Sequence, residues 1–257
     1  MISPLANVHP GAKIGNNVTI EPFATIYDNV VIGDGSYIHP NAVIYPDTII
    51  GENCKIFPGA IIGIINQDLK YKGEKSRTVI GNNTTIREYA TIHKGTADRM
   101  ETRIGNNCLI MCYCHIGHDT FVGNNVIIAN NGNLAGHITV EDYVVIEGVV
   151  AAQQFVTIGA HAFVAGASLV RKSIPPYVRV AREPLQFIGV NTIGLARRGF
   201  DKEVIRQIED IYRIIFVRGH NITNALELVE NEIASSPYRN QILEFIRAQK
   251  DGIVKGI

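Results

Sequence analysis

Five residues that can carry out or support acid–base chemistry recur at related positions of the sequence. His118 and Asp119 end the segment HIGHD, and His137 ends the segment LAGH. His118, Gly136 and Gln154 follow one another at equal intervals along the chain. A neutral imidazole can act as a general base near pH 7, and a backbone N–H at a glycine can stabilise a developing oxyanion. This set therefore predicts acyl transfer to a hydroxyl or an amine.

The same residues are compatible with three other kinds of protein or site. Asn, Asp and His also suit solvated turns, so these residues could be plain corners of a repeat. Metal-dependent hydration, as in γ-type carbonic anhydrases, uses a histidine pair separated by four residues, and no two of the eight histidines are spaced in this way. A binding prism, such as an ice-binding protein, shows a regular threonine ladder that this sequence lacks.

The element that must position these residues is a six-residue repeat, or hexad. An aliphatic residue recurs every six positions, first over residues 8–62 and again over 80–92 and 104–170, with Ala152 as the one small member. A period of six fits neither an α-helix nor a heptad coiled coil, but it fits a short strand followed by a turn. Three such sides make a triangular prism in which residues three hexads apart stack on successive rungs. About 25 hexads give roughly eight rungs, about 40 Å in length.

Stacking at intervals of three hexads also predicts the corners of the prism. It brings His118, Gly136 and Gln154 to one corner. Gly15, Gly33 and Gly51 share the same interval, as do two glycines at 105 and 123. We expect these glycines to mark corners that need unusual backbone angles.

Two polar stretches interrupt the repeat, and a different pattern follows it. Residues 63–79 and 97–103 place no aliphatic residue in the frame, so we expect loops there, and loops on a rigid scaffold often carry function. From about Asp201 the apolar residues keep helical spacing, with Gly219 as a C-cap, and two further amphipathic segments cover about 222–234 and 237–249. We predict a β-helix domain over 1–184 and a helical domain over 185–257.

Composition excludes several classes of protein. The 24 basic and 24 acidic residues balance, which argues against a nucleic-acid partner. No segment is long and apolar enough for a transmembrane helix, and the N-terminus lacks the pattern of a signal peptide, so we expect a cytoplasmic protein. Cys54, Cys108 and Cys114 occupy small-residue positions of the repeat and are expected to be reduced packing residues. Cys112 and Cys114 are too closely spaced for a zinc knuckle.

Several motifs together resemble one specific family. They are NQDLKY (66–71), IREYATIHKGT (86–96), HIGHD (115–119), LAGH (134–137), QQF (153–155), IPPYV (174–178) and GVNTIGLARRGF (189–200). They resemble the acyl-[acyl-carrier-protein]–UDP-N-acetylglucosamine O-acyltransferases, which begin lipid A synthesis, and the resemblance runs nearly from end to end. It implies a left-handed parallel β-helix with a C-terminal helical domain. The hexad spacing alone does not give the handedness.

The resemblance also implies a role for individual residues. His118 would be the general base toward the sugar 3-hydroxyl, Asp119 would orient it, the N–H of Gly136 would form the oxyanion hole and His137 would bind the sugar. The remaining substrate contacts would come from Gln67, Asp68, Lys70, His115 and Gln154, with Asn191, Arg197 and Arg198 contacting the nucleotide and diphosphate. Arginine suits phosphate because guanidinium offers planar, charge-assisted donors; without the resemblance, Arg197 and Arg198 would suit a solvated helix start. Gly166, in VAGAS, would lie beside the acyl chain and leave room for a long one.

Substrates and assembly follow from the same resemblance. It implies transfer of an (R)-3-hydroxyacyl chain from acyl carrier protein to UDP-N-acetylglucosamine within a homotrimer. No metal or redox cofactor is implied, because phosphopantetheine arrives on the carrier protein. Gln153 stands where the family commonly has a histidine, and Ile193 where an acidic residue is often found. An N-acyltransferase acting on a 3-amino or related UDP-sugar is the alternative.

Overall fold

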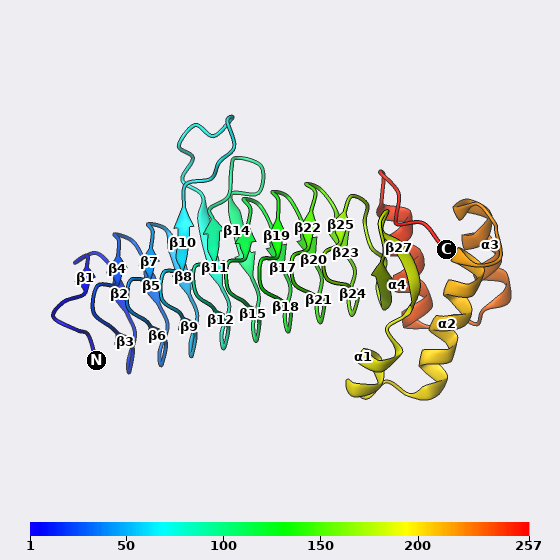
Figure 1. The fold of residues 1–257 in the computed structure, drawn as a ribbon, viewed down its shortest axis with the longest axis horizontal. Helices are drawn as coiled ribbons and strands as arrows, with labels where there is room; N and C mark the ends of the chain where they lie inside the picture. The colour runs from blue at the N-terminus through cyan, green and yellow to red at the C-terminus, as the bar shows by residue number, and fades with distance from the viewer. Residues whose placement is uncertain (257) are drawn as a thin grey trace.

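The repeat folds into a long triangular prism with a helical cap at one end. The computed structural model describes residues 1–256, and Figure 1 shows the rungs following one another from the N-terminus to the cap. Each turn of the chain contributes one strand to each of three sheets, which contain nine, eight and ten strands and pair in parallel except between β26 and β27. Together with the family described below, this architecture confirms the predicted left-handed β-helix.

Most strands are only two residues long, as the hexad pattern predicts. The first sheet contains β1 (Asn7–Val8), β4 (Thr25–Ile26), β7 (Val43–Ile44), β10 (Ile61–Ile64), β13 (Thr91–His93), β16 (His115–Ile116), β19 (Asn133–Leu134), β22 (Ala151–Ala152) and β25 (Leu169–Val170). The second contains β2 (Lys13–Ile14), β5 (Val31–Ile32), β8 (Thr48–Ile50), β11 (Arg77–Ile80), β14 (Glu101–Ile104), β17 (Phe121–Val122), β20 (Thr139–Val140) and β23 (Thr157–Ile158). The third contains β3 (Thr19–Ile20), β6 (Tyr37–Ile38), β9 (Lys55–Ile56), β12 (Thr85–Ile86), β15 (Leu109–Ile110), β18 (Ile127–Ile128), β21 (Val145–Ile146), β24 (Phe163–Val164), β26 (Val178–Ala181) and β27 (Gln186–Val190).

The repeated aliphatic residues form the core of the prism. Parallel pairing sets Ile20 opposite Ile38 and Ile38 opposite Ile56, so side chains three hexads apart stack inside. All three are at most 1% exposed. Burying one such side chain stabilises the fold by roughly 1.5–3 kcal/mol, and the column repeats this contribution on every rung. Cys54, Cys108 and Cys114 are buried in the same core, as predicted.

The corners use glycine for a different reason from the one predicted. The left-handed backbone conformation falls on the residue two positions after the repeated glycines, at Asn17 (φ 56°) and Asn53 (φ 53°), where asparagine is tolerated. A Cβ placed on Gly33 would lie 2.6 Å from the carbonyl carbon of Gly51 on the next rung. These glycines are therefore required because adjacent rungs approach closely, and their own backbone angles are ordinary.

Both predicted loops exist, but the first is shorter than predicted and the second lies three residues nearer the N-terminus. Residues 65–76 connect β10 to β11 and residues 94–100 connect β13 to β14, and both loops rise from the same edge of the prism in Figure 1. Residues 101–103 were expected in the second loop but belong to β14. The hexad pattern missed this extension because its additional inward-facing residue is a threonine and not an aliphatic residue. Thr48, Thr78 and Thr102 pair with one another at this position on three successive rungs.

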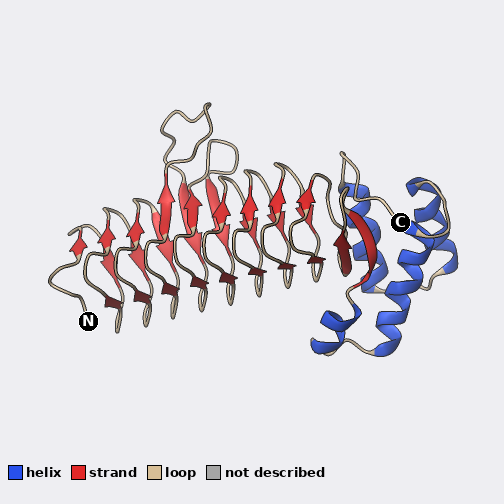
Figure 2. Cartoon of the chain, in the orientation of Figure 1, coloured by secondary structure: helices blue, strands red, loops and turns tan. Residues whose placement is uncertain are grey.

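The C-terminal part closes the end of the prism with a strand and four helices (Figure 2). The helices are α1 (Thr192–Arg197), α2 (Lys202–Phe216), α3 (Ile222–Glu232) and α4 (Pro237–Ala248). Strand β27 pairs antiparallel with β26, and α2 packs its buried face, which includes Ile208 and Tyr212, toward β27. The sequence predicted α2, α3 and α4 but not the short α1. None of the helices within residues 1–256 combines the length and the apolar character needed to cross a membrane.

The predicted domain boundary falls in the turn between β26 and β27. Because β27 still belongs to the third sheet, the prism and the helical cap share this strand pair. The division at residues 184 and 185 stays a prediction. Gly219 has a φ of 76° but lies beyond the α2 C-cap, which is Val217.

Candidate active site

One corner of the prism, where the chain turns from the first sheet to the second, collects the chemically active residues. We call it the site corner. Both loops leave the prism at this corner, after β10 and after β13. On the next three rungs the same corner carries His118 and Asp119 after β16, Gly136 and His137 after β19, and Gln154 after β22. The stacking predicted from the interval of three hexads is therefore present.

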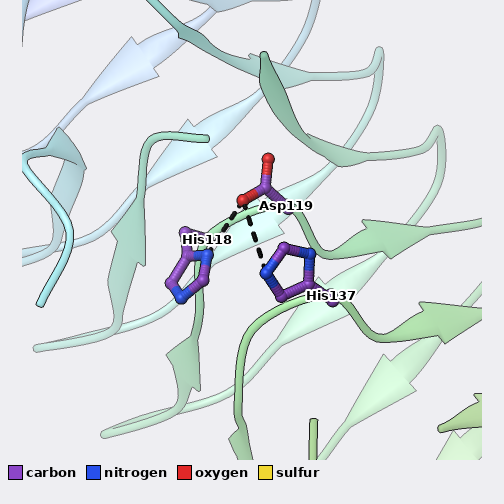
Figure 3. Close-up of side chains that lie close together, drawn as sticks. All are labelled: His118, Asp119 and His137. Atoms are coloured by element: carbon purple, nitrogen blue, oxygen red, sulfur yellow. Dashed lines mark hydrogen bonds and ion pairs between the residues drawn. The ribbon is translucent and has the colours of Figure 1, made fainter. Parts of the chain in front are cut away.

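His118 and Asp119 form a buried hydrogen-bonded pair (Figure 3). Nδ1 of His118 lies 2.9 Å from Oδ2 of Asp119. The side chains are 8% and 0% exposed. Because the Asp119 carboxylate can only accept this hydrogen bond, it favours the His118 tautomer that carries its proton on Nδ1. Nε2 is then free to accept a proton. The adjacent pair in HIGHD thus forms an imidazole base with an orienting carboxylate.

The loop 94–100 surrounds the Asp119 carboxylate with donors. Thr96 donates its N–H to Oδ1 and Oδ2 at 3.0 and 3.1 Å and its hydroxyl to Oδ2 at 2.6 Å, and Arg99 donates its N–H to Oδ1 at 3.0 Å. Burial alone would raise the pKa of the Asp119 carboxyl, but the hydrogen bonds from Thr96, His118 and Arg99 outweigh burial and lower it below its ordinary value. Asp119 is therefore held as a carboxylate.

Gly136 lies directly against the imidazole of His118. A Cβ added to Gly136 would lie 2.6 Å from Nε2 of His118, so any other residue would displace the ring. The N–H of Gly136 donates to no acceptor among residues 1–256. A free backbone donor beside the reactive nitrogen can bind an oxyanion.

His137 completes the cluster from the next rung. Its ring is perpendicular to that of His118, with centroids 4.9 Å apart, and stacks on Phe155 at 4.6 Å. Its Nε2 lies 4.0 Å from Oδ2 of Asp119. Its Nδ1 lies 2.9 Å from Oδ2 of Asp98 but is not aligned for a hydrogen bond, so this buried nitrogen is without a formal partner. The sequence did not indicate Asp98.

A cavity of about 630 Å³ opens in front of this cluster. Its lining includes seven predicted site residues, Gln67, Asp68, Lys70, His115, His118, Gly136 and Gln154. The loop 65–76 therefore lies over the same chain's imidazole base. It is fixed to the second loop because Asn66 donates from Nδ2 to the carbonyl of Gly95 at 3.3 Å.

His93 is a cavity residue that the sequence did not single out. It lies at the end of β13 and packs edge-on against His115, with centroids 4.7 Å apart. Burial, reinforced by the neighbouring His115 and His118, lowers its pKa to about 4. Nδ1 of His115 lies 2.8 Å from the hydroxyl of Thr91, and burial lowers the pKa of this histidine too. Both rings are therefore neutral at pH 7. The sequence signal that included His93 was its place in the segment IREYATIHKGT (86–96).

A metal ion at this corner would compete with existing hydrogen bonds. His118, Asp119 and His137 each place one potential donor atom within 4.8 Å of the others. Both oxygens of Asp119 already accept hydrogen bonds, and Nδ1 of His118 is bonded to one of them. The arrangement fits proton transfer by His118 better than coordination of a metal.

The residues predicted to contact the nucleotide lie elsewhere. Asn191, Arg197 and Arg198 line a second cavity of about 430 Å³ against the third sheet, which forms the prism face opposite the site corner. The Asn191 side chain accepts from the N–H of Gly194 and donates to the carbonyl of His161, so it holds α1 in place. The two arginines stand at the end of α1, not at a helix start as the alternative held.

Arg198 keeps part of its guanidinium free. Its Nη2 donates to the carbonyl of Tyr143 at 3.0 Å, and the group stacks over the Tyr143 ring. Its Nη1 is buried without a partner. Burial lowers the pKa of Arg198, which nevertheless stays a cation. An anion entering this second cavity would find an unpaired donor.

Gly166 lies at the corner between the third and first sheets. It is exposed, and the left-handed conformation of this turn belongs to its neighbour Ala167 (φ 57°). A Cβ on Gly166 would lie 3.3 Å from the carbonyl oxygen of Gly148. The backbone angle therefore does not require glycine here. Ile193, one of the two departures from the family, is exposed at the rim of the second cavity, and Gln153 lines a separate polar cavity beside Gln154.

The chain resembles known acyltransferases over its whole length. The family described as "Udp N-acetylglucosamine O-acyltransferase; Domain 2" matches residues 174–254, and the bacterial transferase hexapeptide family matches residues 29–64 and 101–136. The acyl-[acyl-carrier-protein]–UDP-N-acetylglucosamine O-acyltransferase of Myxococcus xanthus is 40% identical over 195 residues, 76% of each chain. The UDP-N-acetylglucosamine acyltransferase from Bacteroides fragilis has a solved structure with a TM-score of 0.98 and 47% identity, covering 99% of this chain and 100% of that one. The enzyme from Francisella novicida has a TM-score of 0.96 and 39% identity, with coverages of 99% and 94%. This protein therefore belongs to the acyl-[acyl-carrier-protein]–UDP-N-acetylglucosamine O-acyltransferase family.

Proposed function

We propose that this protein transfers an (R)-3-hydroxyacyl group from acyl carrier protein to the glucosamine 3-hydroxyl of UDP-N-acetylglucosamine, the first step of lipid A biosynthesis. The observation that carries this proposal is the buried His118–Asp119 pair beside the free N–H of Gly136. Membership of the family supplies the donor and acceptor, which the names of the relatives state for those proteins.

The reaction needs only side chains and backbone of the site corner. Nε2 of His118 takes the proton of the 3-hydroxyl as the sugar oxygen bonds to the thioester carbonyl carbon. The N–H of Gly136 donates to the resulting oxyanion. When the tetrahedral intermediate collapses, the carbon–sulfur bond breaks and the phosphopantetheine thiolate takes the proton from the His118 imidazolium. Asp119 stays ionised and stabilises that imidazolium.

The remaining lining of the first cavity would recognise the acceptor and the donor. Lys70 on the loop 65–76 offers a cation, and Asp68 and Gln67 offer hydrogen-bond acceptors and donors beside it. His115 and Gln154 line the same cavity from the prism, and His137 stands beside the base. Phosphopantetheine comes with the carrier protein, so the mechanism requires no resident cofactor.

A shared site in a homotrimer explains why the predicted residues fall into two cavities. The two cavities have no lining residue in common, and they lie on opposite sides of the prism. A nucleotide sugar that contacts both His118 and Arg198 therefore needs the second cavity of a neighbouring chain. A closed ring of three prisms would form three such sites. We propose this assembly, and the cytoplasm as its compartment.

One assay tests the function directly. The purified protein would be incubated with a panel of acyl carrier proteins, bearing 3-hydroxyacyl chains of different lengths, and with UDP-sugars that carry a 3-hydroxyl or a 3-amino group. Mass spectrometry should detect an acylated UDP-N-acetylglucosamine whose ester bond is cleaved by mild alkali. An alkali-stable amide formed only on a 3-amino sugar would replace the proposal by N-acyl transfer. Loss of every product would overturn acyl transfer altogether.

A further inference from the structure

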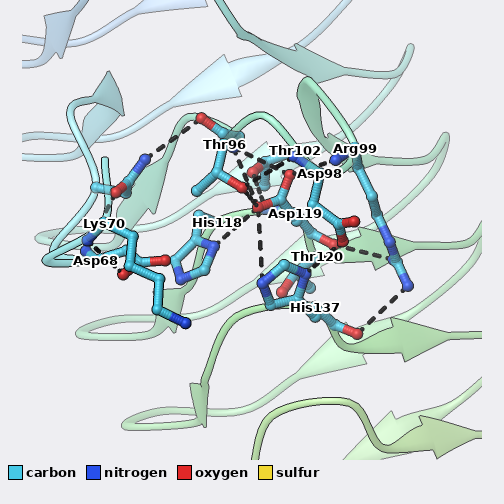
Figure 4. Close-up of polar contacts among 12 residues, drawn as sticks. Asp68, Lys70, Thr96, Asp98, Arg99, Thr102, His118, Asp119, Thr120 and His137 are labelled. Atoms are coloured by element: carbon cyan, nitrogen blue, oxygen red, sulfur yellow. Dashed lines mark hydrogen bonds and ion pairs between the residues drawn. The ribbon is translucent and has the colours of Figure 1, made fainter. Parts of the chain in front are cut away.

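The loop 94–100 does more than cover the site corner. It supplies four of the hydrogen-bond contacts to the Asp119 carboxylate, three from Thr96 and one from Arg99 (Figure 4). The fifth comes from His118. Oδ2 accepts both the Thr96 hydroxyl at 2.6 Å and Nδ1 of His118 at 2.9 Å. The orientation of the carboxylate is thus set mainly by a loop that carries no predicted site residue.

Another rung of the same corner shows how much the loop contributes to the Asp119 carboxylate. Asp47 precedes the first loop, has a similar left-handed backbone (φ 61°), and is partly exposed. Its carboxylate accepts a hydrogen bond from Nδ2 of Asn29 at 2.6 Å and lies 3.5 Å from Nζ of Lys94 on the loop 94–100. Asp119 has a φ of 56° but is completely buried, with both oxygens bonded. The same corner geometry therefore yields a partly exposed carboxylate where the loop contributes one lysine side chain, and a completely buried carboxylate where the loop contributes two backbone N–H groups and a hydroxyl.

The loop is itself held rigidly. The Ser76 hydroxyl donates to the carbonyl of Gly95 at 2.5 Å, which joins the second loop to the base of the first. Arg99 donates from Nη1 to the carbonyl of Asp119 at 2.9 Å and reaches the carbonyl of His137 from Nη2 at 3.4 Å. Its guanidinium also stacks over Phe121, 4.8 Å from the ring centroid. The loop thereby joins the two rungs that carry the imidazoles.

We propose that Thr96 is a positioning residue for acyl transfer, whose N–H and hydroxyl hold the Asp119 carboxylate against Nδ1 of His118. The proposal rests on the function proposed above. Thr96 touches no reacting atom, and it acts through Asp119 on the tautomer and the orientation of His118. Because a charge-assisted hydrogen bond that orients a catalytic group contributes to kcat and not to substrate binding, its loss should appear in kcat.

The test compares two substitutions at this position. Thr96→Val removes the hydroxyl and keeps the shape, and kcat should fall about tenfold while KM for both substrates stays within about twofold. Thr96→Ser keeps the hydroxyl, and kcat should stay within about twofold of the wild type. A wild-type kcat in Thr96→Val, or a serine variant as impaired as the valine variant, would overturn the proposal.

A matched control separates positioning from general packing. Thr84 is also a buried threonine, but it lies at a different corner and its hydroxyl donates to a backbone carbonyl, that of Gly105, at 2.8 Å. Thr84→Val should lower the thermal stability to a similar degree as Thr96→Val and leave kcat unchanged. A similar loss of kcat in both valine variants would mean that Thr96 acts only through packing.

A double-mutant cycle with Asp119→Asn gives a readout that a structural role would not change. If Thr96 acts through the carboxylate, Thr96→Val should cause little further loss of kcat in the Asp119→Asn background. A full tenfold additional loss would show that the two residues act independently and would overturn the proposal. An inactive wild-type protein would contradict the proposed function itself, whereas an active wild type with an unimpaired Thr96→Val would contradict only this inference.

Discussion

Two corners of the prism have the same backbone conformation but use their backbone N–H groups differently. At the corner between the second and third sheets, the N–H of Asn106 donates to Oδ1 of Asn124, and that of Asn124 donates to Oδ1 of Asp142. We call this column the asparagine ladder. His118 and Gly136 occupy the same hexad positions at the site corner. Because Gly136 has no side chain, it offers no acceptor to the rung before it, and its own N–H is free.

The comparison shows how a uniform repeat produces one reactive place. The asparagine ladder uses its backbone donors to fasten rungs together, which serves stability. The site corner leaves a donor free and adds two loops that bury the hydrogen-bonded pair of His118 and Asp119. The chemistry thus arises where the repeat leaves its own hydrogen bonds unmade, and the following predictions test that contrast.

The largest effect should come from removing the base. His118→Ala should lower kcat by about 10²–10⁴, the usual range for the loss of a general base, without unfolding the protein. The matched change on the asparagine ladder, Asn106→Ala, should cost about 1 kcal/mol of unfolding free energy and leave kcat unchanged. Steady-state kinetics and thermal unfolding of both variants check this. Wild-type turnover of His118→Ala at saturating substrate would disprove the assignment.

A change at the third corner should alter which acyl chain is used. Gly166→Met should depress activity with long 3-hydroxyacyl donors and spare ten-carbon ones. Excluding four methylenes forfeits roughly 3 kcal/mol, over a hundredfold in preference. Gly166→Ala adds only the Cβ and is the control for strain at this turn. A methionine variant with the wild-type chain-length profile would leave Gly166 as a plain corner residue.

Converting the site corner into an asparagine ladder should weaken the oxyanion hole. In Gln154→Asn, the shorter amide can accept the N–H of Gly136 as Asn124 accepts that of Asn106. We expect kcat about tenfold below that of Gln154→Ala, since losing one oxyanion donor typically costs at least this much. Kinetics of the two variants at saturating substrates decide the matter. Equal kcat values would show that the free N–H is not the relevant donor.

Mixing two inactive variants tests whether the two cavities meet between chains. His118→Ala and Arg198→Ala subunits, combined in mixed trimers, should recover activity at about a quarter of the sites. Native mass spectrometry would verify the mixing, and each variant alone is the control. Activity that stays at the level of the single variants in verified mixed trimers would argue against a shared site.

The smallest effect concerns His161. This residue has a left-handed backbone (φ 59°) and lies at the same corner as the asparagine ladder, between β23 and β24. Burial lowers the pKa of His161 to about 4, and its Nδ1 has no partner. Because the unfolded chain binds this proton at a higher pH, stability should fall as the pH drops from about 6.5 to about 4. His161→Phe keeps the stacking on Tyr143 and should reduce that fall by on the order of 1 kcal/mol, allowing for partial exposure. Urea unfolding at pH 7 and pH 4.5 measures it, and an unchanged pH dependence would contradict the assignment.

Several parts of the site were predictable because the repeat converts sequence distance into spatial distance. An interval of three hexads places His118, Gly136 and Gln154 on neighbouring rungs, and a cavity forms over them. His93 was missed because an insertion separates it from His115 by more than three hexads, which breaks the interval although the strands still pair. Helix α1 was missed because its six residues are too few for a recognisable periodicity.

The sequence by itself determined the prism, its core and the corner that carries the imidazole base, because short strands stacked at about 4.8 Å leave one solution for a six-residue period. It could not determine how the loops fold back, since a polar segment of irregular backbone has no period to follow. Only the tertiary structure showed that Thr96 and Arg99 close over Asp119. Only it showed that Arg197 and Arg198 lie on the face opposite the site corner. Contacts between segments outside the repeat depend on where the chain returns in space, and that is set by packing.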